Sequence, residues 1–210
     1  MPWHDERDRI VSRYNARLAT AGPTREALAV GPASHHELRF AALCDLGISN
    51  GDSVLDIGCG LGDFRRYLKA RGLEVHYTGV DLNPQLVAHA AIRHPGSIFC
   101  VADAVEDDLP MADWVVSSTA FNLRLESVDN LSLAQRVLER AFRASRKGVA
   151  FDFLSQFAEF QHPDAYHYDP LELFAFAKSL TKRVTLRHDY PLFEFMLYLF
   201  PDFTGWGAPA

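Results

Sequence analysis

A glycine-rich run that directly follows an apolar stretch constrains this chain more than any other feature of its sequence. Residues 54–57 are apolar except for Asp56, and glycine then recurs at Gly58, Gly60 and Gly62. Glycine adopts backbone angles that other residues avoid, and it lets a ligand approach the main chain. A strand that ends in such a turn and leads into a helix is typical of sites for nucleotide-like ligands, because the helix N-terminus offers free N–H groups.

Short apolar runs and helical patterns alternate through the middle of the chain. Helices are expected over 35–46, with Ser34 as the N-cap, over about 63–71, and from Asn83 and Pro84 onward. Strands joined by helices and built from near-continuous apolar runs form one parallel sheet that is covered on both faces. The alternation therefore predicts a doubly wound α/β fold. Its first five strands are expected at about 54–57, 75–81, 98–101, 114–116 and 149–151.

The pattern changes after the fifth expected strand. A helix is expected from Asp169 and Pro170, followed by two strands at 183–188 and 192–200. The turn between these strands is too short for a parallel crossover, so the pair is expected to be antiparallel. The expected fold class is thus α/β: a doubly wound, seven-stranded, mostly parallel sheet with a C-terminal antiparallel hairpin.

Composition and charge narrow the class of function. The 210 residues are 48% hydrophobic and 23% charged, which is typical of a globular domain, and the net charge of −6 argues against a protein that coats nucleic acid. No stretch approaches the roughly 20 apolar residues of a membrane span. Three cysteines without a C-x-x-C pair favour a reducing cytoplasm, and His35 and His36 lack metal-ligand spacing and are expected to face solvent. We expect a cytoplasmic protein without a metal, whose partner is a small molecule rather than nucleic acid or a membrane.

Three consecutive expected strands end in an acidic residue. Asp56 precedes the glycine-rich run and would suit a cationic ligand. Asp81 ends the second strand, where a carboxylate can accept hydrogen bonds from two ribose hydroxyls. Asp103 follows the third strand and can accept a hydrogen bond from an exocyclic amine such as that of adenine. The glycine spacing, G-x-G-x-G, differs from the G-x-G-x-x-G of dinucleotide-binding domains, which disfavours a dinucleotide.

In these three motifs the chain resembles the class I S-adenosylmethionine-dependent methyltransferases, over roughly residues 35–200. The resemblance implies a seven-stranded sheet with a reversed final strand and S-adenosylmethionine as the cofactor. It places the glycine-rich run around the methionine part, Asp81 at the ribose and Asp103 at the adenine edge. The cofactor-binding residues assigned in this way are Asp56, Gly58, Cys59, Gly60, Asp81, Leu82, Asp103, Ala104 and Ser118.

The end of the fourth strand bears on the methyl acceptor. Residues 117–122 read SSTAFN, whereas the amino methyltransferases that act on nucleic acid or on protein glutamine carry an Asn/Asp-Pro-Pro-Tyr run there. The resemblance therefore favours methyl transfer to an oxygen or nitrogen of a small molecule.

Methyl transfer can require a side chain that accepts a proton. His167 and Tyr168 are the catalytic candidates, because they lie in a stretch rich in His, Tyr and Asp after the fifth strand, where a substrate lid is expected. A surface histidine at the start of a helix and a tyrosine that only packs are the alternatives. Tyr14, in the expected N-terminal helix, is a further candidate that could fold over the cofactor.

The chain is expected to divide into residues 1–34, a helical appendage over the cofactor site, residues 35–203, the methyltransferase domain, and residues 204–210, a flexible tail. Two other functions stay open: an NAD-dependent oxidoreductase on a similar sheet, and a catalytically silent module that binds the cofactor only as a ligand. Binding of NAD without S-adenosylmethionine would indicate the first. Intact cofactor motifs argue against the second without proving turnover.

Overall fold

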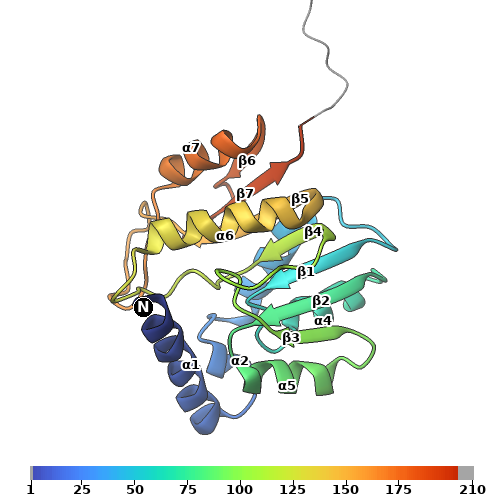
Figure 1. Cartoon of the computed structure of the whole chain (residues 1–210), viewed down its shortest axis with the longest axis vertical. Coiled ribbons are helices and arrows are strands. Elements are labelled where there is room, and N and C mark those ends of the chain that lie inside the picture. The colour runs from blue at the N-terminus through green and yellow to red at the C-terminus, as the bar shows by residue number, and fades with distance from the viewer. Residues whose placement is uncertain (1, 203–210) are drawn as a thin grey trace, which may run out of the picture.

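The computed structural model describes residues 2–202, and its centre is a seven-stranded sheet with the order β3-β2-β1-β4-β5-β7-β6 (Figure 1). Strands β1 to β5 are parallel, whereas β7 runs antiparallel to both of its neighbours. This topology confirms the predicted fold class. The strands are β1 (Ser53–Ile57), β2 (His76–Asp81), β3 (Ile98–Val101), β4 (Ala112–Ser117), β5 (Ser145–Leu154), β6 (Arg183–Arg187) and β7 (Glu194–Phe200). The expected tail, residues 204–210, lies outside the described residues.

Helices cover both faces of the sheet. They are α1 (Pro2–Ala21), α2 (Arg25–Leu28), α3 (Ala33–Cys44), α4 (Asp63–Ala70), α5 (Pro84–Arg93), α6 (Asn130–Ala144) and α7 (Pro170–Leu180). Residues of α3 and α4 share one apolar cluster with Val54, and residues of α6 and α7 share another with Leu55. Since Val54 and Leu55 point to opposite faces of β1, the two helix pairs lie on opposite sides of the sheet. None of the described helices is long and apolar enough to cross a membrane.

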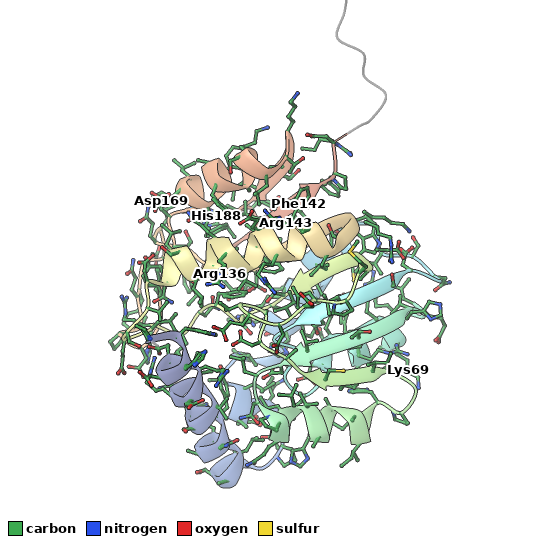
Figure 2. All side chains as sticks on the ribbon, in the orientation of Figure 1. Lys69, Arg136, Phe142, Arg143, Asp169 and His188 are labelled. Carbon is green, nitrogen blue, oxygen red and sulfur yellow. The ribbon has the colours of Figure 1, made fainter. Side chains whose placement is uncertain are left out.

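Helix α6 shows why apolar spacing was a sound guide to the helices. Four of its residues recur at intervals of three and four positions and are at most 1% exposed: Ala134, Val137, Leu138 and Ala141. The solvent-facing side carries Arg136 and Arg143 (Figure 2), and Arg143 donates a hydrogen bond to Glu139 at 2.5 Å. The helix is therefore amphipathic, with its apolar stripe on the sheet.

The structure corrects three details of the expected boundaries. The expected helix 35–46 spans Ala33–Cys44, so Ser34 lies inside it and does not cap it; the N-cap is Pro32, without a side-chain hydrogen bond. The expected strand 192–200 begins only at Glu194. His188 lies beyond the end of β6 and is exposed. Apolar spacing marks an element well but its ends only to within a few residues.

Candidate active site

All nine residues that the sequence assigned to a cofactor line one cavity at the carboxyl edge of the sheet. Asp56 lies on β1, Asp81 ends β2, Asp103 follows β3 and Ser118 follows β4. The cavity lies where the strand order reverses, between β1 and β4, which is the place where open α/β sheets bind their ligands.

The glycine-rich turn brings the main chain to the cavity. Gly58 and Gly60 have positive φ angles of 73° and 54°. A Cβ atom on Gly58 would lie only 2.5 Å from the Cβ of Ala120. The N–H groups of Gly58 and Cys59 donate to the carbonyl of Val80 at 2.8 and 3.0 Å, which ties the turn to β2. Glycine is required at position 58 because a larger residue would meet both strained angles and a steric clash.

Asp81 has both carboxylate oxygens engaged by main-chain N–H groups. Its Oδ2 accepts a hydrogen bond from Gly60 N and its Oδ1 accepts one from Asn83 N, each at 2.9 Å. Burial raises the pKa of Asp81, and these hydrogen bonds oppose that rise. Asp81 therefore links the glycine-rich turn to the start of α5. Each carboxylate oxygen still has a lone pair for a ligand in the cavity.

Asp56 is buried beside Tyr77, whose hydroxyl donates a hydrogen bond to Oδ2. Burial raises the pKa of Asp56 to about 7; the Tyr77 hydrogen bond lowers it, and the nearby charge of Asp81 raises it again. With a pKa of about 7 the carboxyl group is partly protonated at neutral pH. A bound cation nearby would favour its ionised form.

We expect this raised pKa to make stability depend on pH. A carboxyl group whose pKa is higher in the folded than in the unfolded chain binds more protons when folded, so the free energy of unfolding falls as pH rises from about 4 to about 7. The slope from one such group approaches about 1.4 kcal/mol per pH unit, and Asp56→Asn should remove it. Urea unfolding of both proteins at two pH values inside this window measures the difference, and equal slopes would contradict the expectation.

Asp103 is in contact with the N-terminal helix. The indole Nε1 of Trp3 donates a hydrogen bond to Oδ2 of Asp103 at 2.7 Å, and the N–H of Val105 donates to Oδ1 at 2.8 Å. Next to it, Arg140 of α6 donates to the carbonyl of Ala104 at 2.9 Å. Side chains of α1 and of α6 therefore both hold the loop after β3 in place.

Helix α1 lies beside the carboxyl ends of the strands (Figure 1, blue) and closes one side of the cavity. Trp3, Ile10 and Tyr14 contribute to the cavity wall, and Asn15 accepts a hydrogen bond from Asn83 Nδ2 at 2.8 Å. Tyr14, which the sequence suggested could fold over a cofactor, thus lies at the cavity.

A buried carboxylate fastens α1 to the loop before α6. Glu6 is 1% exposed and accepts hydrogen bonds from the N–H groups of Glu126 and Ser127 at 3.0 and 2.9 Å. Arg9 Nε donates to the same carboxylate at 2.7 Å. Burial raises the pKa of Glu6, but the hydrogen bonds from Ser127 and Arg9 outweigh this effect, so the pKa is lowered. The ionised form of Glu6 is therefore the one that holds the helix in place.

Glu6→Ala is expected to loosen α1 without unfolding the sheet. The substitution leaves two N–H groups near Ser127 without their acceptor, at a cost of about 1–3 kcal/mol each where they stay buried. Hydrogen–deuterium exchange over residues 2–21 should accelerate about tenfold or more, while the amides of β1 and β4 keep their rates. Glu26→Ala, at an exposed position of α2, is the matched control. Faster exchange throughout the chain would show that Glu6 supports the whole fold instead.

The end of β4 is held by a buried acid that sequence analysis missed. Asp152 on β5 is 1% exposed and accepts hydrogen bonds from Ser118 Oγ at 2.5 Å and from Thr119 N at 2.6 Å. Burial and the nearby Glu194 raise the pKa of Asp152, whereas Arg39 lowers it. Thr119 has a φ of 60°, which is uncommon for a residue other than glycine. Asp152 thus holds Ser118 and Thr119, which follow β4 and line the cavity.

The two predicted catalytic residues occupy different positions. Tyr168 lines the cavity and is 1% exposed, and its hydroxyl donates a hydrogen bond to the carbonyl of Phe121 at 2.8 Å. Burial raises the pKa of Tyr168. His167 is not among the described residues that line the cavity; its Nδ1 lies 2.9 Å from the carbonyl oxygen of Ser155, and its Nε2 is buried without a partner in the described protein. The fold therefore places Tyr168, but not His167, in the wall of the cavity that the strand-end acids also line.

His36 also lines the cavity, although the sequence suggested that it faces solvent. It is 7% exposed, and its ring lies 5.1 Å from that of Phe40. Burial and the charge of Arg39 lower its pKa to about 4, so the ring is neutral near pH 7. The sequence could have indicated this burial, because His36 precedes the apolar Phe40 by four positions and so lies on the same face of the helix.

The residues at the cavity fit the cofactor that the sequence resemblance implied. Asp56, Asp81 and Asp103 offer carboxylate acceptors to an ammonium, a ribose and an adenine amine from one wall. Gly58 and Gly60 keep side chains away from the main chain where such a ligand would approach. The acids also suit the positive charge of a sulfonium.

Comparisons with known proteins agree with this fit. The family model described as a methyltransferase domain matches residues 54–148. Over 153 residues the chain is 37% identical to the Mycobacterium tuberculosis protein Rv1506c, which is described as a methyltransferase; the match covers 69% of this chain and 90% of that protein. Over 104 residues it is 34% identical to the malonyl-[acyl-carrier protein] O-methyltransferase of Pectobacterium atrosepticum, covering 50% of this chain and 38% of that enzyme.

A solved structure shares the fold. The magnesium protoporphyrin IX methyltransferase of Synechocystis, crystallised with bound S-adenosylhomocysteine, superposes with a TM-score of 0.62 at 13% identity. The superposition covers 82% of this chain and 89% of that enzyme. At this identity the likeness establishes the architecture, and the activity has to be argued from the site.

Proposed function

The chain belongs to the class I S-adenosylmethionine-dependent methyltransferases, and from this premise we propose that it transfers a methyl group to an oxygen or nitrogen of a small molecule. The observation that carries the proposal is one cavity in which Asp56, Asp81 and Asp103, at the ends of three adjacent strands, face a space with otherwise largely apolar walls. The Pectobacterium relative is named for malonyl-[acyl-carrier protein] and the Synechocystis enzyme of similar fold for magnesium protoporphyrin IX, so these names do not identify the acceptor here.

The strand-end residues would hold the cofactor as the sequence motifs indicate. Asp81 would accept hydrogen bonds from the ribose hydroxyls, Asp103 would accept one from the adenine amine, and Asp56 would face the amino group of the methionine part. Leu82 and Ala104 would lie beside the adenine ring, and the glycine-rich turn and the end of β4 would complete the site. The cofactor supplies an electrophilic methyl group on a sulfonium.

The protein itself would hold the acceptor in position and exclude water from the reaction. An in-line displacement gains rate when the nucleophile is held about 3–3.5 Å from the methyl carbon. Helix α1 covers one side of the cavity, and Tyr168 is anchored to Phe121, so both limit the directions from which an acceptor can enter. The acceptor would lose its proton as its oxygen or nitrogen bonds to the methyl carbon, and the methyl–sulfur bond would break to leave a neutral thioether. Of the two predicted candidates for taking that proton, Tyr168 lies at the cavity, whereas His167 is not among the described residues that line it.

We also propose the setting in which the protein acts. Cys44, Cys59 and Cys100 are free thiols, which suits the reducing cytoplasm. The net charge of −6 does not favour nucleic acid as a partner. Residues 1–34 would serve as the cover of the cofactor site, and residues 35–203 as the catalytic domain.

Thermal unfolding with added ligands tests the proposed function. S-adenosylmethionine and S-adenosylhomocysteine, each at about 100 times its dissociation constant, should each stabilise the protein by roughly 2.7 kcal/mol, which raises Tm by several degrees at this size. NAD at the same concentration should have no effect. A rise in Tm with NAD alone would point to an oxidoreductase, and no rise with either adenosyl ligand would contradict the proposal.

A further inference from the structure

His36 is a buried polar side chain in the cavity wall whose ring nitrogens have no protein partner. It is 7% exposed, its ring lies edge-on to that of Phe40, and no described residue forms a hydrogen bond with either ring nitrogen. A neutral imidazole carries one N–H donor, and a buried donor without an acceptor costs free energy. The ring therefore lacks an acceptor that a ligand in the cavity could supply.

Most other side chains in the wall that can donate a hydrogen bond are already engaged. Their acceptors lie in the protein: Trp3 donates to Asp103, Asn83 to Asn15, Ser118 to Asp152, Asn130 to the carbonyl of Leu123, and Tyr168 to the carbonyl of Phe121. The described residues of the wall include no lysine or arginine. Burial and the nearby charge of Asp81 raise the pKa of Tyr14, so that hydroxyl lies toward the proposed ribose site. For an anionic group at the other end of the cavity, His36 is the side chain with a donor to spare.

The start of α4 lies in the same part of the wall. The ring of Phe40 lies 5.3 Å from that of Phe64, and Asp63 and Phe64 begin α4 and line the cavity. The N-cap is Gly62, without a side-chain hydrogen bond, and the main-chain N–H groups of Asp63 and Phe64 have no acceptor among the described residues. N–H groups in the first turn of a helix favour an anion. His36 and the start of α4 thus offer donors to one anionic group.

The charged side chains around His36 largely offset one another. Burial lowers the pKa of His36 most; of the nearby charges, Arg39, Arg25 and Arg66 lower it and Asp63 raises it. Two of these arginines are ion-paired, Arg39 with Glu194 at 2.6 Å and Arg66 with Asp63 at 3.4 Å. The uncommitted N–H donors, and not a net positive charge, would therefore bind the anion.

The methionine part of the cofactor brings such an anion to this end of the cavity. Its carboxylate is attached to the same carbon as its ammonium, which Asp56 faces in the proposed function. Asp56 itself cannot serve the carboxylate, because an ionised carboxyl group only accepts hydrogen bonds. A donor is thus required close to Asp56 and the glycine-rich turn.

We propose that His36 and the start of α4 form a subsite for a carboxylate. The carboxylate is that of the cofactor's methionine part or that of the methyl acceptor, and the experiment distinguishes the two sources. The proposal rests on the proposed function, because the subsite lies in the same cavity.

Two adenosyl ligands that differ only in the carboxylate test the first source. They are S-adenosylhomocysteine and S-adenosyl-3-thiopropylamine, which lacks it, and isothermal titration calorimetry at pH 7.5 measures both affinities. The native chain should bind S-adenosylhomocysteine about tenfold or more tightly than the other ligand. His36→Phe keeps an aromatic ring without a donor and should reduce that ratio about fivefold or more, whereas His36→Gln keeps an N–H donor and should retain most of it. His35→Phe, at a neighbouring position outside the described wall, should leave the ratio unchanged.

Benzoate tests the second source, with benzyl alcohol as its uncharged counterpart. The imidazole signal of His36 in a ¹H–¹³C correlation spectrum, assigned by its loss in His36→Phe, is followed as each ligand is added. If the cofactor supplies the carboxylate, S-adenosylhomocysteine shifts this signal and S-adenosyl-3-thiopropylamine shifts it much less. If the acceptor supplies it, benzoate shifts the signal of the protein saturated with S-adenosylhomocysteine, and benzyl alcohol does not.

An affinity ratio that His36→Phe leaves unchanged, together with a His36 signal that benzoate does not shift, overturns the proposal. Equal effects of His36→Phe and His35→Phe on the ratio also overturn it, because the change then does not come from the cavity wall. Failure of both adenosyl ligands to bind contradicts the proposed function instead. Benzoate measured without them still reports the carboxylate subsite, so the two failures are distinguishable.

Discussion

S-adenosylhomocysteine should bind the Asp81→Ala variant about a hundredfold or more weakly than the native chain. The carboxylate is proposed to accept charge-assisted hydrogen bonds from the ribose, which are worth about 1.5–3 kcal/mol. It also accepts hydrogen bonds from Gly60 N and Asn83 N at 2.9 Å, so its loss frees the glycine-rich turn that faces the same ligand. Both effects weaken one binding event and together reach about 3 kcal/mol. Isothermal titration calorimetry measures the change.

Two further variants separate the roles of Asp81. Asp81→Asn keeps the shape and one carbonyl acceptor, so its affinity should fall between those of the native and alanine proteins. Asp108→Ala removes an exposed acid outside the cavity wall and should bind like the native chain. Urea unfolding of each ligand-free protein separates a loss of stability from a loss of affinity. An alanine variant within about threefold of native affinity would remove the ribose assignment.

The strand-end acids could be assigned from sequence because their convergence follows from topology. In a parallel sheet the carboxyl ends of the strands meet at one edge, so acids at the ends of three consecutive strands had to lie near one another once the alternation was recognised. Asp56, Asp81 and Asp103 indeed line one cavity. The antiparallel pairing of the two C-terminal strands could also be predicted from the sequence, because it depended only on the length of one turn.

Contacts between distant segments could not be assigned in the same way. The indole of Trp3 and the carboxylate of Asp103 are 100 residues apart, and no local pattern selects this pair. The buried Asp152 lies one position beyond the expected strand 149–151, and its role as acceptor for Ser118 and Thr119 depends on the register between β4 and β5. Local sequence therefore predicted which residues face the cavity from their own strands, but not which partners hold them there.

A buried ion pair between α3 and β7 is another such contact, and a second large effect is expected there. Arg39 is 5% and Glu194 3% exposed, and the guanidinium donates to both carboxylate oxygens at 2.7 and 2.6 Å. The same guanidinium donates to the carbonyl of Val30 at 2.8 Å. Arg39 thus joins the segment before α3 to the start of β7, which pairs with the strand β5 that carries Asp152.

Arg39→Met should lower the free energy of unfolding by about 3–5 kcal/mol, because it leaves the carboxylate of Glu194 buried without its counter-charge. The loss is aggravated by Asp152, whose pKa is raised by burial and by Glu194 and lowered by Arg39. Without the guanidinium, two buried carboxyl groups repel each other. Urea unfolding at pH 7 measures the effect, and a loss below about 1 kcal/mol would show that the pair does not stabilise the fold.

Removing both members of the pair should recover most of that stability. In the double variant Arg39→Met/Glu194→Met, no uncompensated charge replaces the pair, and similar apolar volume fills the space, a change that is often close to neutral in other proteins. Asp152 then loses both the neighbour that raises its pKa and the one that lowers it, so it should still hold Ser118 and Thr119. We therefore expect the double variant to bind S-adenosylhomocysteine with near-native affinity. If it is as unstable as the single variant, the hydrogen bond to Val30, and not the stranded charge, is what the fold loses.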